Sequence, residues 1–235
     1  MRLGVLTGSV LPKGAHPVIG PTDVEFGDPS SSPISIKNMG HELVLIARHG
    51  LPPHIPSHRI NHMANVKALA DMGPKAVISV CSSGALSKDM DVPSLAVPED
   101  YIDLFSGSTY HDDGIFHATP GFDEDLRESL IRSCGTAGME FRSGGTYVQT
   151  MGPRLETRAE VRLLAGWGDY VGMNLGPEAT LCCELGIPHA ALLTVDNMAH
   201  GLTVSTLDYR DILESASSRW EEIEKVLFIL CEKYG

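Results

Sequence analysis

The sequence predicts an α/β fold. Short apolar stretches of the kind that form buried strands alternate along the chain with longer stretches of helical periodicity. Several of the apolar stretches run directly into polar residues, which is how α/β proteins place ligand-binding groups at one edge of a sheet. The length of 235 residues suits one domain with a substantial core, so we expect a single domain spanning residues 1–235.

The expected strands are short and mostly apolar. The first, at 2–6, runs into a Gly-Ser turn, and the run LVLIA at 43–47 is typical of a buried strand. Residues 11–33 and 51–57 are rich in proline or glycine, so we expect loops there, the first with room for a short strand. The predicted strands are 2–6, 43–47, 76–81, 95–97, 145–149, 170–173 and 189–195.

The expected helices lie between these strands. In 61–72 apolar residues recur at helical spacing, and a Gly-Pro pair follows as a stop signal. Asp123 is expected to cap the helix that follows it. The predicted helices are 61–72, 123–135, 157–166, 177–185 and a closing amphipathic helix at 206–232.

The composition excludes several classes of function. The net charge is −12, from 18 basic and 30 acidic residues, which argues against a nucleic-acid or anionic-membrane partner. The apolar run at the N-terminus is too short for a signal segment or a membrane span, so we expect a cytoplasmic protein. The five cysteines and ten histidines show no metal-ligand spacing, so we expect reduced thiols and no bound metal.

Polar residues at the ends of three predicted strands suggest an anion site. Ser9 follows the first strand, Arg48 and His49 follow the second, and Ser82 with Ser83 follows the strand at 76–81. Hydroxyl groups, backbone N–H groups and a guanidinium around one point are what phosphate requires. A surface salt bridge is the alternative for Arg48.

A second polar cluster lies in 145–157 and 171–197. These stretches read GTYVQTMGPRLET and VGMNLGPEATLCCELGIPHAALLTVDN, and polar residues follow their apolar runs. Amide and carboxylate groups at strand ends suit a pocket for a polar ring. For Glu156 the alternative is a carboxylate in the first turn of the next helix, and for Asn197 it is a turn-forming asparagine.

Five motifs of the chain resemble those of the trimeric purine nucleoside phosphorylase and methylthioadenosine phosphorylase family. They occur in the family's order and cover nearly the whole chain. The motifs are Gly8-Ser9, Ala47-Arg48-His49-Gly50, INHMAN at 60–65, GPRLET at 152–157, and Gly172-Met173 through Pro177-Glu178-Ala179. The resemblance is greatest to the branch that acts on 6-oxopurine nucleosides or S-methyl-5′-thioinosine. It implies a mixed, partly barrel-like central sheet flanked by helices.

The resemblance implies phosphorolysis of a purine nucleoside to the free base and a ribose 1-phosphate, in purine salvage. Inorganic phosphate is then the co-substrate, no cofactor is needed, and the assembly is a homotrimer or a homohexamer. The implied phosphate ligands are Ser9, Arg48, His49, Ser82 and Asn174. This chain departs from the family pattern at Cys81 and Asn174, where the family more often has Thr or Asn and a hydroxyl residue, respectively.

Glu156 and Asn197 are the implied readers of the base, and they join His49 as the expected catalytic residues. A 6-oxopurine presents a proton at N1 and an acceptor at O6, so a carboxylate facing N1 favours it over adenine. An asparagine can serve both O6 and a proton at N7, whereas members that prefer adenine nucleosides tend to have an aspartate there. If the register of this strand is shifted by one residue, Asp196 faces the base instead, and the preference for a 6-oxopurine over adenine inverts.

The resemblance also implies the residues around the sugar. Met173 lies under the ribose, Leu155 belongs to the substrate pocket, Tyr209 lines the 5′ end, and His117 closes that end from the adjacent subunit. For Met173 a core methionine is the alternative, and for His117 a surface-loop histidine.

Three rivals to a 6-oxopurine phosphorylase stay open. A methylthioadenosine phosphorylase would release adenine, a hydrolase would ignore phosphate, and a nucleoside-binding protein would show no turnover.

Overall fold

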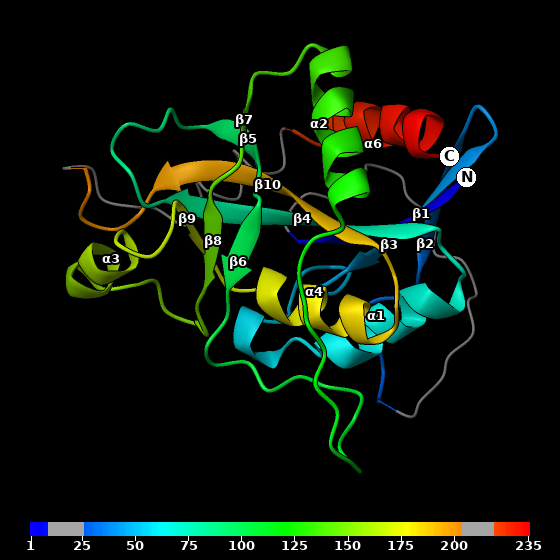
Figure 1. The fold of residues 1–235 in the computed structure, drawn as a ribbon, viewed down its shortest axis with the longest axis horizontal. Coiled ribbons are helices and arrows are strands. Elements are labelled where there is room, and N and C mark those ends of the chain that lie inside the picture. The colour runs from blue at the N-terminus through cyan, green and yellow to red at the C-terminus, as the bar shows by residue number, and fades with distance from the viewer. Residues whose placement is uncertain (9–25, 204–218) are drawn as a thin grey trace.

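The structure is a computed structural model that describes residues 1–8, 26–203 and 219–235, and it confirms the α/β fold (Figure 1). Its described strands form one ten-stranded mixed sheet. The main path runs β2-β3-β1-β4-β10-β5-β7, and β9, β8 and β6 branch from the end of β4. The strands are β1 Arg2–Thr7, β2 Ile34–Asn38, β3 His41–Ala47, β4 Ala76–Ala85, β5 Ser94–Val97, β6 Asp100–Ile102, β7 Phe141–Ser143, β8 Thr146–Gln149, β9 Tyr170–Gly172 and β10 His189–Met198.

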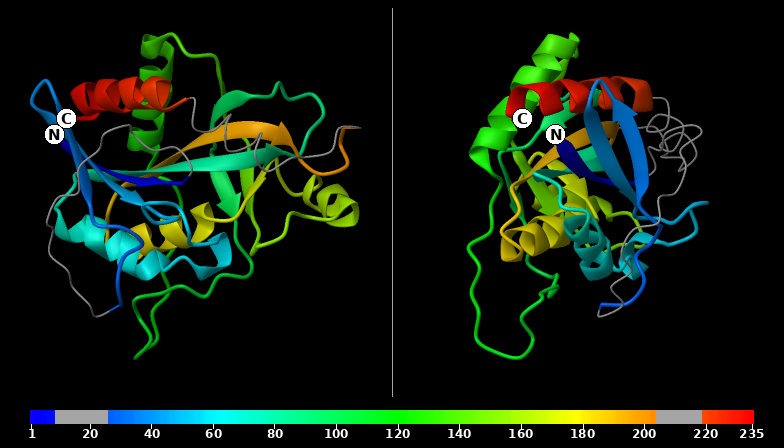
Figure 2. Two further views of the ribbon diagram at one scale, coloured as in Figure 1. Left: turned by 180° about the vertical axis from the view of Figure 1, so that it is seen from behind. Right: turned by 90° about the vertical axis from the view of Figure 1, so that its right-hand side faces the viewer.

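Helices cover both faces of the sheet (Figures 1 and 2). α2 and α6 pack on one face, and α1 and α4 pack on the other. A short helix, α3, lies beyond the end that holds β8 and β9. The helical elements are η1 Ser57–Arg59, α1 His62–Asp71, α2 Glu124–Ala137, α3 Arg158–Leu164, α4 Leu175–Glu184 and α6 Trp220–Tyr234.

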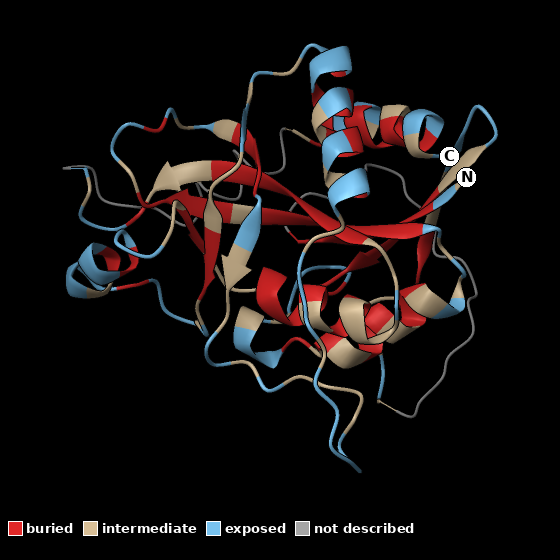
Figure 3. Cartoon of the chain, viewed as in Figure 1, coloured by how far each residue is buried: buried red, intermediate tan, exposed pale blue. Residues whose placement is uncertain are grey.

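The alternation of side chains along buried strands explains this layering. In β3, Leu43 and Leu45 face the core under α2 and α6, whereas Val44 and Ile46 face α1 and α4. The central strands are therefore apolar on both faces, and Figure 3 shows them buried along most of their length.

The helix boundaries follow local capping chemistry. The side chain of Asp123 accepts a hydrogen bond from the Leu126 N–H, as predicted, and α2 ends at Gly138 with φ of +74°. Thr157 and Glu160 form a reciprocal capping box at the start of α3. These contacts satisfy backbone groups that a helix end leaves without intrahelical partners.

Most predicted elements are confirmed, and the differences concern edges. The strand predicted at 76–81 continues to Ala85, because β10 and β9 both pair with its far end. β2, β6 and β7 were not predicted as strands. Each has at most five residues, and apart from Ile34 in β2 all of them are partly or fully exposed, so the apolar pattern is weak. The closing helix is confirmed for Trp220–Tyr234, and residues 204–218 lie outside the described part of the chain.

Long β4 joins the two parts of the sheet. Its first half pairs with β1 and β10, and its last residues, Gly84 and Ala85, also pair with β9. The pair β8–β9 is thereby brought close to the carboxyl end of β10. No helix of the described chain is long and apolar enough to cross a membrane.

We predict that Leu192→Ala destabilises the protein by about 2–5 kcal/mol, because it opens a cavity in a close-packed core. Leu192 lies in β10, is completely buried and packs between the sheet and the helices α2 and α6. The measurement is urea unfolding monitored by circular dichroism. Leu163→Ala is the matched control, since Leu163 is 55% exposed. The control should change the free energy of unfolding by less than about 0.5 kcal/mol. Equal losses in the two variants would contradict this account of the core.

Candidate active site

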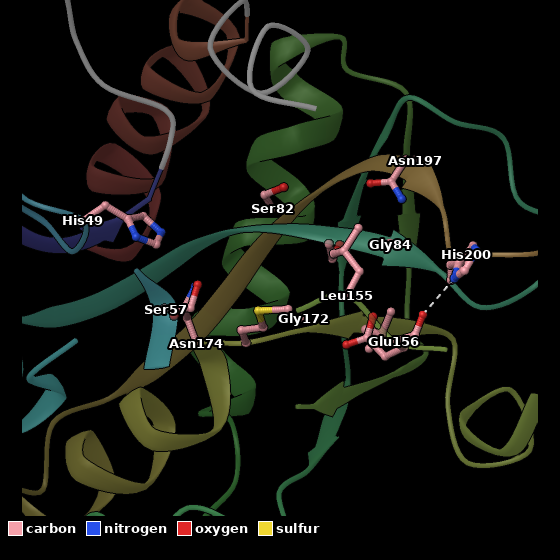
Figure 4. A pocket seen from close by; sticks show the side chains of 14 residues that line it. His49, Ser57, Ser82, Gly84, Leu155, Glu156, Gly172, Asn174, Asn197 and His200 are labelled. Atoms are coloured by element: carbon pink, nitrogen blue, oxygen red, sulfur yellow. Dashed lines mark hydrogen bonds between the residues drawn. The ribbon is translucent and has the colours of Figure 1, made fainter. Parts of the chain in front are cut away.

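A cavity lies at the carboxyl ends of β4, β9 and β10 (Figure 4). The structure brings together there seven of the residues predicted from the sequence. The cavity is lined by His49, Ser57, Ser82, Ser83, Gly84, Leu155, Glu156, Val171, Gly172, Met173, Asn174, Asn197, Ala199 and His200. Because parallel β4 and β10 end side by side, residues more than 100 positions apart face one space.

Asn197 reaches the cavity because β10 contains a bulge. Val195 pairs with Ser83 and Asn197 with Gly84, so Asp196 is the extra residue. Asn197 lines the cavity, and its Nδ2 donates to the backbone oxygen of Met198 at 2.8 Å. That contact orients the amide, leaving Oδ1 and one N–H for a ligand. The alternative of a turn-forming asparagine is wrong, because Asn197 lies within a strand.

Glu156 is a cavity residue rather than a helix cap. Thr157 and Glu160 cap α3, whereas the Glu156 carboxylate accepts a hydrogen bond from the Thr150 hydroxyl at 2.7 Å. The residue is only 8% exposed, and one of its oxygens is fixed by this bond. The ring nitrogen Nδ1 of His200 lies 3.0 Å from the Glu156 backbone oxygen, which ties the base of the side chain to the segment after β10 (Figure 4).

Met173 and Asn174 form the turn between β9 and α4. The backbone N–H of Asn174 donates to the Tyr147 hydroxyl at 3.3 Å, and its side chain does not cap α4. Its Oδ1 is buried with no hydrogen-bond partner among the described residues. A buried polar atom without a partner costs free energy, so its position at a cavity is consistent with contact to a ligand.

His49 presents a hydrogen-bond acceptor to the cavity when it is neutral. Its Nδ1 lies 2.7 Å from the backbone oxygen of Ile55, so Nδ1 carries the proton and Nε2 a lone pair. Burial lowers the pKa of His49, which favours this neutral form. A methyl group built on Gly8 would lie 3.1 Å from Arg48 Nη1 and 3.7 Å from His49 Nε2. Glycine therefore lets the chain approach both side chains closely.

Arg48 is completely buried in an ion pair with Glu178. The Arg48 Nε and Nη2 donate to the two Glu178 oxygens at 2.8 and 2.9 Å, and backbone oxygens of Leu6 and Val80 accept two further bonds. The alternative of a surface salt bridge is therefore wrong. Arg48 does not line the cavity among the described residues, and one Nη1 N–H next to Gly8 is not used by these four bonds.

Other groups complete the shell around Glu178. The Ser79 hydroxyl donates to Glu178 at 2.6 Å, and His189 Nε2 lies 2.9 Å from that hydroxyl oxygen. His62 Nδ1 lies 3.5 Å from the carboxylate. Burial opposes the charge, but Arg48 and His62 outweigh it and lower the pKa of Glu178 to about 2. Burial lowers the pKa of His189 to about 4, so it is neutral at pH 7.

Besides Arg48, three predicted residues are not placed at the cavity. Ser9 and Tyr209 lie outside the described residues. His117 is exposed on the loop between β6 and α2, away from the cavity of its own chain. Sequence reasoning missed Ser57 and His200, whose only signal was a position beside a predicted motif. It assigned no role to Glu178, although the motif containing it was noted.

Four of the five cysteines are buried, and Cys183 is partly exposed. All five are free, and Cys81, the position that departs from the family pattern, lies completely buried in β4. Burial raises the pKa of Cys81 to about 12, so it carries no charge near the cavity at neutral pH.

In this α/β protein the cavity brings imidazole and hydroxyl groups together with amide and carboxylate groups, a combination that suits a small polar ligand. Comparison with known proteins agrees with this class. The sequence pattern of the phosphorylase superfamily matches residues 2–230, so the chain belongs to this family.

Two relatives are similar to this chain over most of its length. A probable 6-oxopurine nucleoside phosphorylase of Archaeoglobus fulgidus is 45% identical over 189 residues, covering 80% of this chain and 78% of the relative. A probable S-methyl-5′-thioinosine phosphorylase of Methanosarcina acetivorans is 36% identical over 217 residues, covering 91% and 81%. A solved methylthioadenosine phosphorylase of Schistosoma mansoni in complex with adenine has the same fold. Its TM-score is 0.83 at 22% identity, covering 98% of this chain and 91% of that one.

We predict that Glu178→Gln lowers the free energy of unfolding at pH 7 by about 3–5 kcal/mol, because Arg48 is left buried without a counter-charge. The folded-state pKa of Glu178 lies below its ordinary value of 4.5. Its contribution is therefore present above about pH 4.5 and is lost as the pH falls toward 2. Urea unfolding at several pH values should show the gap between wild type and variant closing over that range.

Glu128→Gln is the control, because Glu128 forms an exposed pair with Arg132 on α2. It should change stability by less than about 1 kcal/mol at any pH. A Glu178→Gln variant as stable as this control at pH 7 would contradict the role given to the buried pair.

Proposed function

We propose that this protein, an enzyme of the purine nucleoside phosphorylase type, cleaves 6-oxopurine nucleosides with inorganic phosphate. The products are hypoxanthine or guanine and a ribose 1-phosphate, or its 5-methylthio form. The observation that carries the choice of base is that Asn197 and Glu156 both line the cavity, whereas Asp196 is hydrogen-bonded to Ser82. The nearer relatives named above support the same class.

The two side chains match the edges of a 6-oxopurine. One Glu156 oxygen is occupied by Thr150, which leaves the other to accept the proton at N1. One N–H of Asn197 is used by Met198, which leaves the second for O6 and Oδ1 for a proton at N7. Adenine offers an acceptor at N1, so it would leave the Glu156 carboxylate facing a lone pair.

The reaction follows from stabilising charge that develops as the glycosidic bond breaks. C1′ becomes cationic and the base becomes anionic, so phosphate held near C1′ stabilises the cation and then captures it. Asn197 stabilises the charge appearing at N7 and O6, a contact that strengthens in the transition state. His49, Ser82, Asn174 and Arg48 are the proposed phosphate ligands in the described chain, and Ser9 is proposed with them. Met173 and Leu155 are proposed to contact the sugar and base. The mechanism needs no metal and no organic cofactor.

The test of this function is base release, followed by chromatography, from methylthioinosine, inosine, methylthioadenosine and adenosine, each with and without phosphate. We expect phosphate-dependent release of hypoxanthine and little release of adenine. Glu156→Gln should lower kcat/KM for the inosine compounds by about 10²-fold, because it removes a charged acceptor at N1. Preferred adenine release would establish a methylthioadenosine phosphorylase instead. Release without phosphate would indicate a hydrolase, and no release a binding protein.

We also propose that copies of this chain assemble, as a trimer or a hexamer, so that His117 of the partner subunit closes the 5′ end of each cavity. The loop carrying His117 projects from the body of the protein in Figures 1 and 2. It exposes large apolar side chains, since Leu104, Phe105 and Ile115 are 63%, 65% and 93% exposed. Exposed apolar groups gathered on one segment are typical of an interface.

Light scattering should therefore give a mass of three chains or a multiple of three. His117→Ala should raise KM for methylthioinosine about tenfold, with a smaller effect on KM for phosphate, because His117 is proposed to touch only the 5′ group. His111→Ala, on the same loop, is the matched control. A monomer with wild-type activity would contradict this proposal.

A further inference from the structure

Asp196 is not among the described residues that line the cavity, but it is hydrogen-bonded to Ser82, which does line it. Its Oδ2 accepts hydrogen bonds from the Ser82 hydroxyl at 2.5 Å and from the Thr194 hydroxyl at 2.9 Å. Two hydroxyl groups converging on one oxygen indicate an ionised carboxylate, which can only accept. The short Ser82 contact is in the range of a charge-assisted bond. The bulge in β10 makes this contact possible, because it turns Asp196 and Asn197 to different neighbours.

This contact fixes the direction of the Ser82 hydroxyl. A serine has one proton to donate, and here it is given to Asp196. Ser82 lines the cavity, so the part of the hydroxyl that a ligand meets is a lone pair. A serine usually regarded as a donor to phosphate is thus an acceptor here. His49 also lines the cavity, and its Nε2 is an acceptor when the ring is neutral.

The charges near this end of the cavity point in the same direction. No lysine or arginine is found among the described residues that line the cavity, and the one carboxylate in that lining, Glu156, lies at the end proposed to hold the base. The buried Arg48 is balanced by Glu178. A tetrahedral anion that offers only oxygen lone pairs would face the lone pair of Ser82 and the charge of Asp196 behind it, whereas an anion with a hydroxyl group can donate to Ser82.

We propose that Asp196 acts through Ser82 as a specificity-determining residue, making the phosphate subsite select tetrahedral anions that carry a hydroxyl group. Hydrogen phosphate and hydrogen arsenate belong to this class, and sulfate at neutral pH does not. The inference rests on the proposed phosphorolysis, because it places phosphate next to His49 and Ser82. It adds a residue and a selection rule for the protonated anion. Asp196 is a positioning residue in this account, since it does not touch the anion.

The test is calorimetric titration of the whole protein with phosphate and with sulfate at one pH near neutral. This readout does not depend on turnover. Wild type should bind phosphate about tenfold to hundredfold more tightly than sulfate, the range of one hydrogen bond to a charged partner. Asp196→Ala frees the Ser82 proton, so sulfate should bind more tightly and the ratio should fall about tenfold or more. Ser82→Ala is a second variant, expected to lower the ratio by weakening phosphate binding alone.

Thr194→Val is the matched control, because it removes the other hydroxyl bound to Asp196 and leaves the Ser82 contact in place. It should keep the wild-type ratio. An unchanged ratio in both Asp196→Ala and Ser82→Ala, each shown to be folded by circular dichroism, would overturn the inference. The inference would also be overturned if these two variants changed the preference between inosine and its 2′- or 3′-deoxy forms but left the ratio of phosphate to sulfate affinity unchanged. Ser82 would then accept a hydrogen bond from the sugar rather than from the anion. Absence of phosphate-dependent base release in wild type would instead refute the proposed function.

Discussion

The buried ion pair between Arg48 and Glu178 is the constraint on which the cavity depends. It joins the end of β3 to α4, and its remaining bonds reach β1 and β4 through backbone oxygens and Ser79. Two charges this deeply buried are stable only when each keeps its partners, so these elements cannot shift independently. The pair also affects the electrostatics near the cavity, because the positive charge of Arg48, which lies beside Gly8, is balanced by Glu178.

The two ends of the cavity, proposed to hold the base and the anion, differ in their hydrogen-bonding groups. The base end has directed groups with one position already occupied, as Glu156 is bound by Thr150 and Asn197 by Met198. The end proposed to hold the anion has acceptors in His49 and Ser82, and the Asn174 oxygen, which has no hydrogen-bond partner among the described residues, also lines this cavity. Preorganised groups of this kind can distinguish ligands by proton positions as well as by size.

The sequence predicted the sheet and its helices well, because strands buried on both faces have continuous apolar runs and helix starts have recognisable caps. It also placed Arg48, His49, Ser82 and Asn197 at strand ends, where parallel topology gathers them. It did not predict the short edge strands, in which almost every residue is partly or fully exposed. The Ser79–His189 contact was also beyond it, because these residues lie 110 positions apart and match no motif.

The bulge in β10 is a feature that could not be located from the sequence. From the sequence, either Asp196 or Asn197 could face the base, because a shift of one residue reverses every side chain of a strand. Only the pairing with β4 shows that Asp196 is the extra residue, and Asn197 is the one of the two that lines the cavity.

The most direct test of the proposed roles of Asp196 and Asn197 is a crystal structure of the protein with hypoxanthine and phosphate. The account predicts Asn197 at N7 and O6, Glu156 at N1, and Asp196 bound to Ser82. A base contacted by Asp196, with Asn197 turned away, would contradict it.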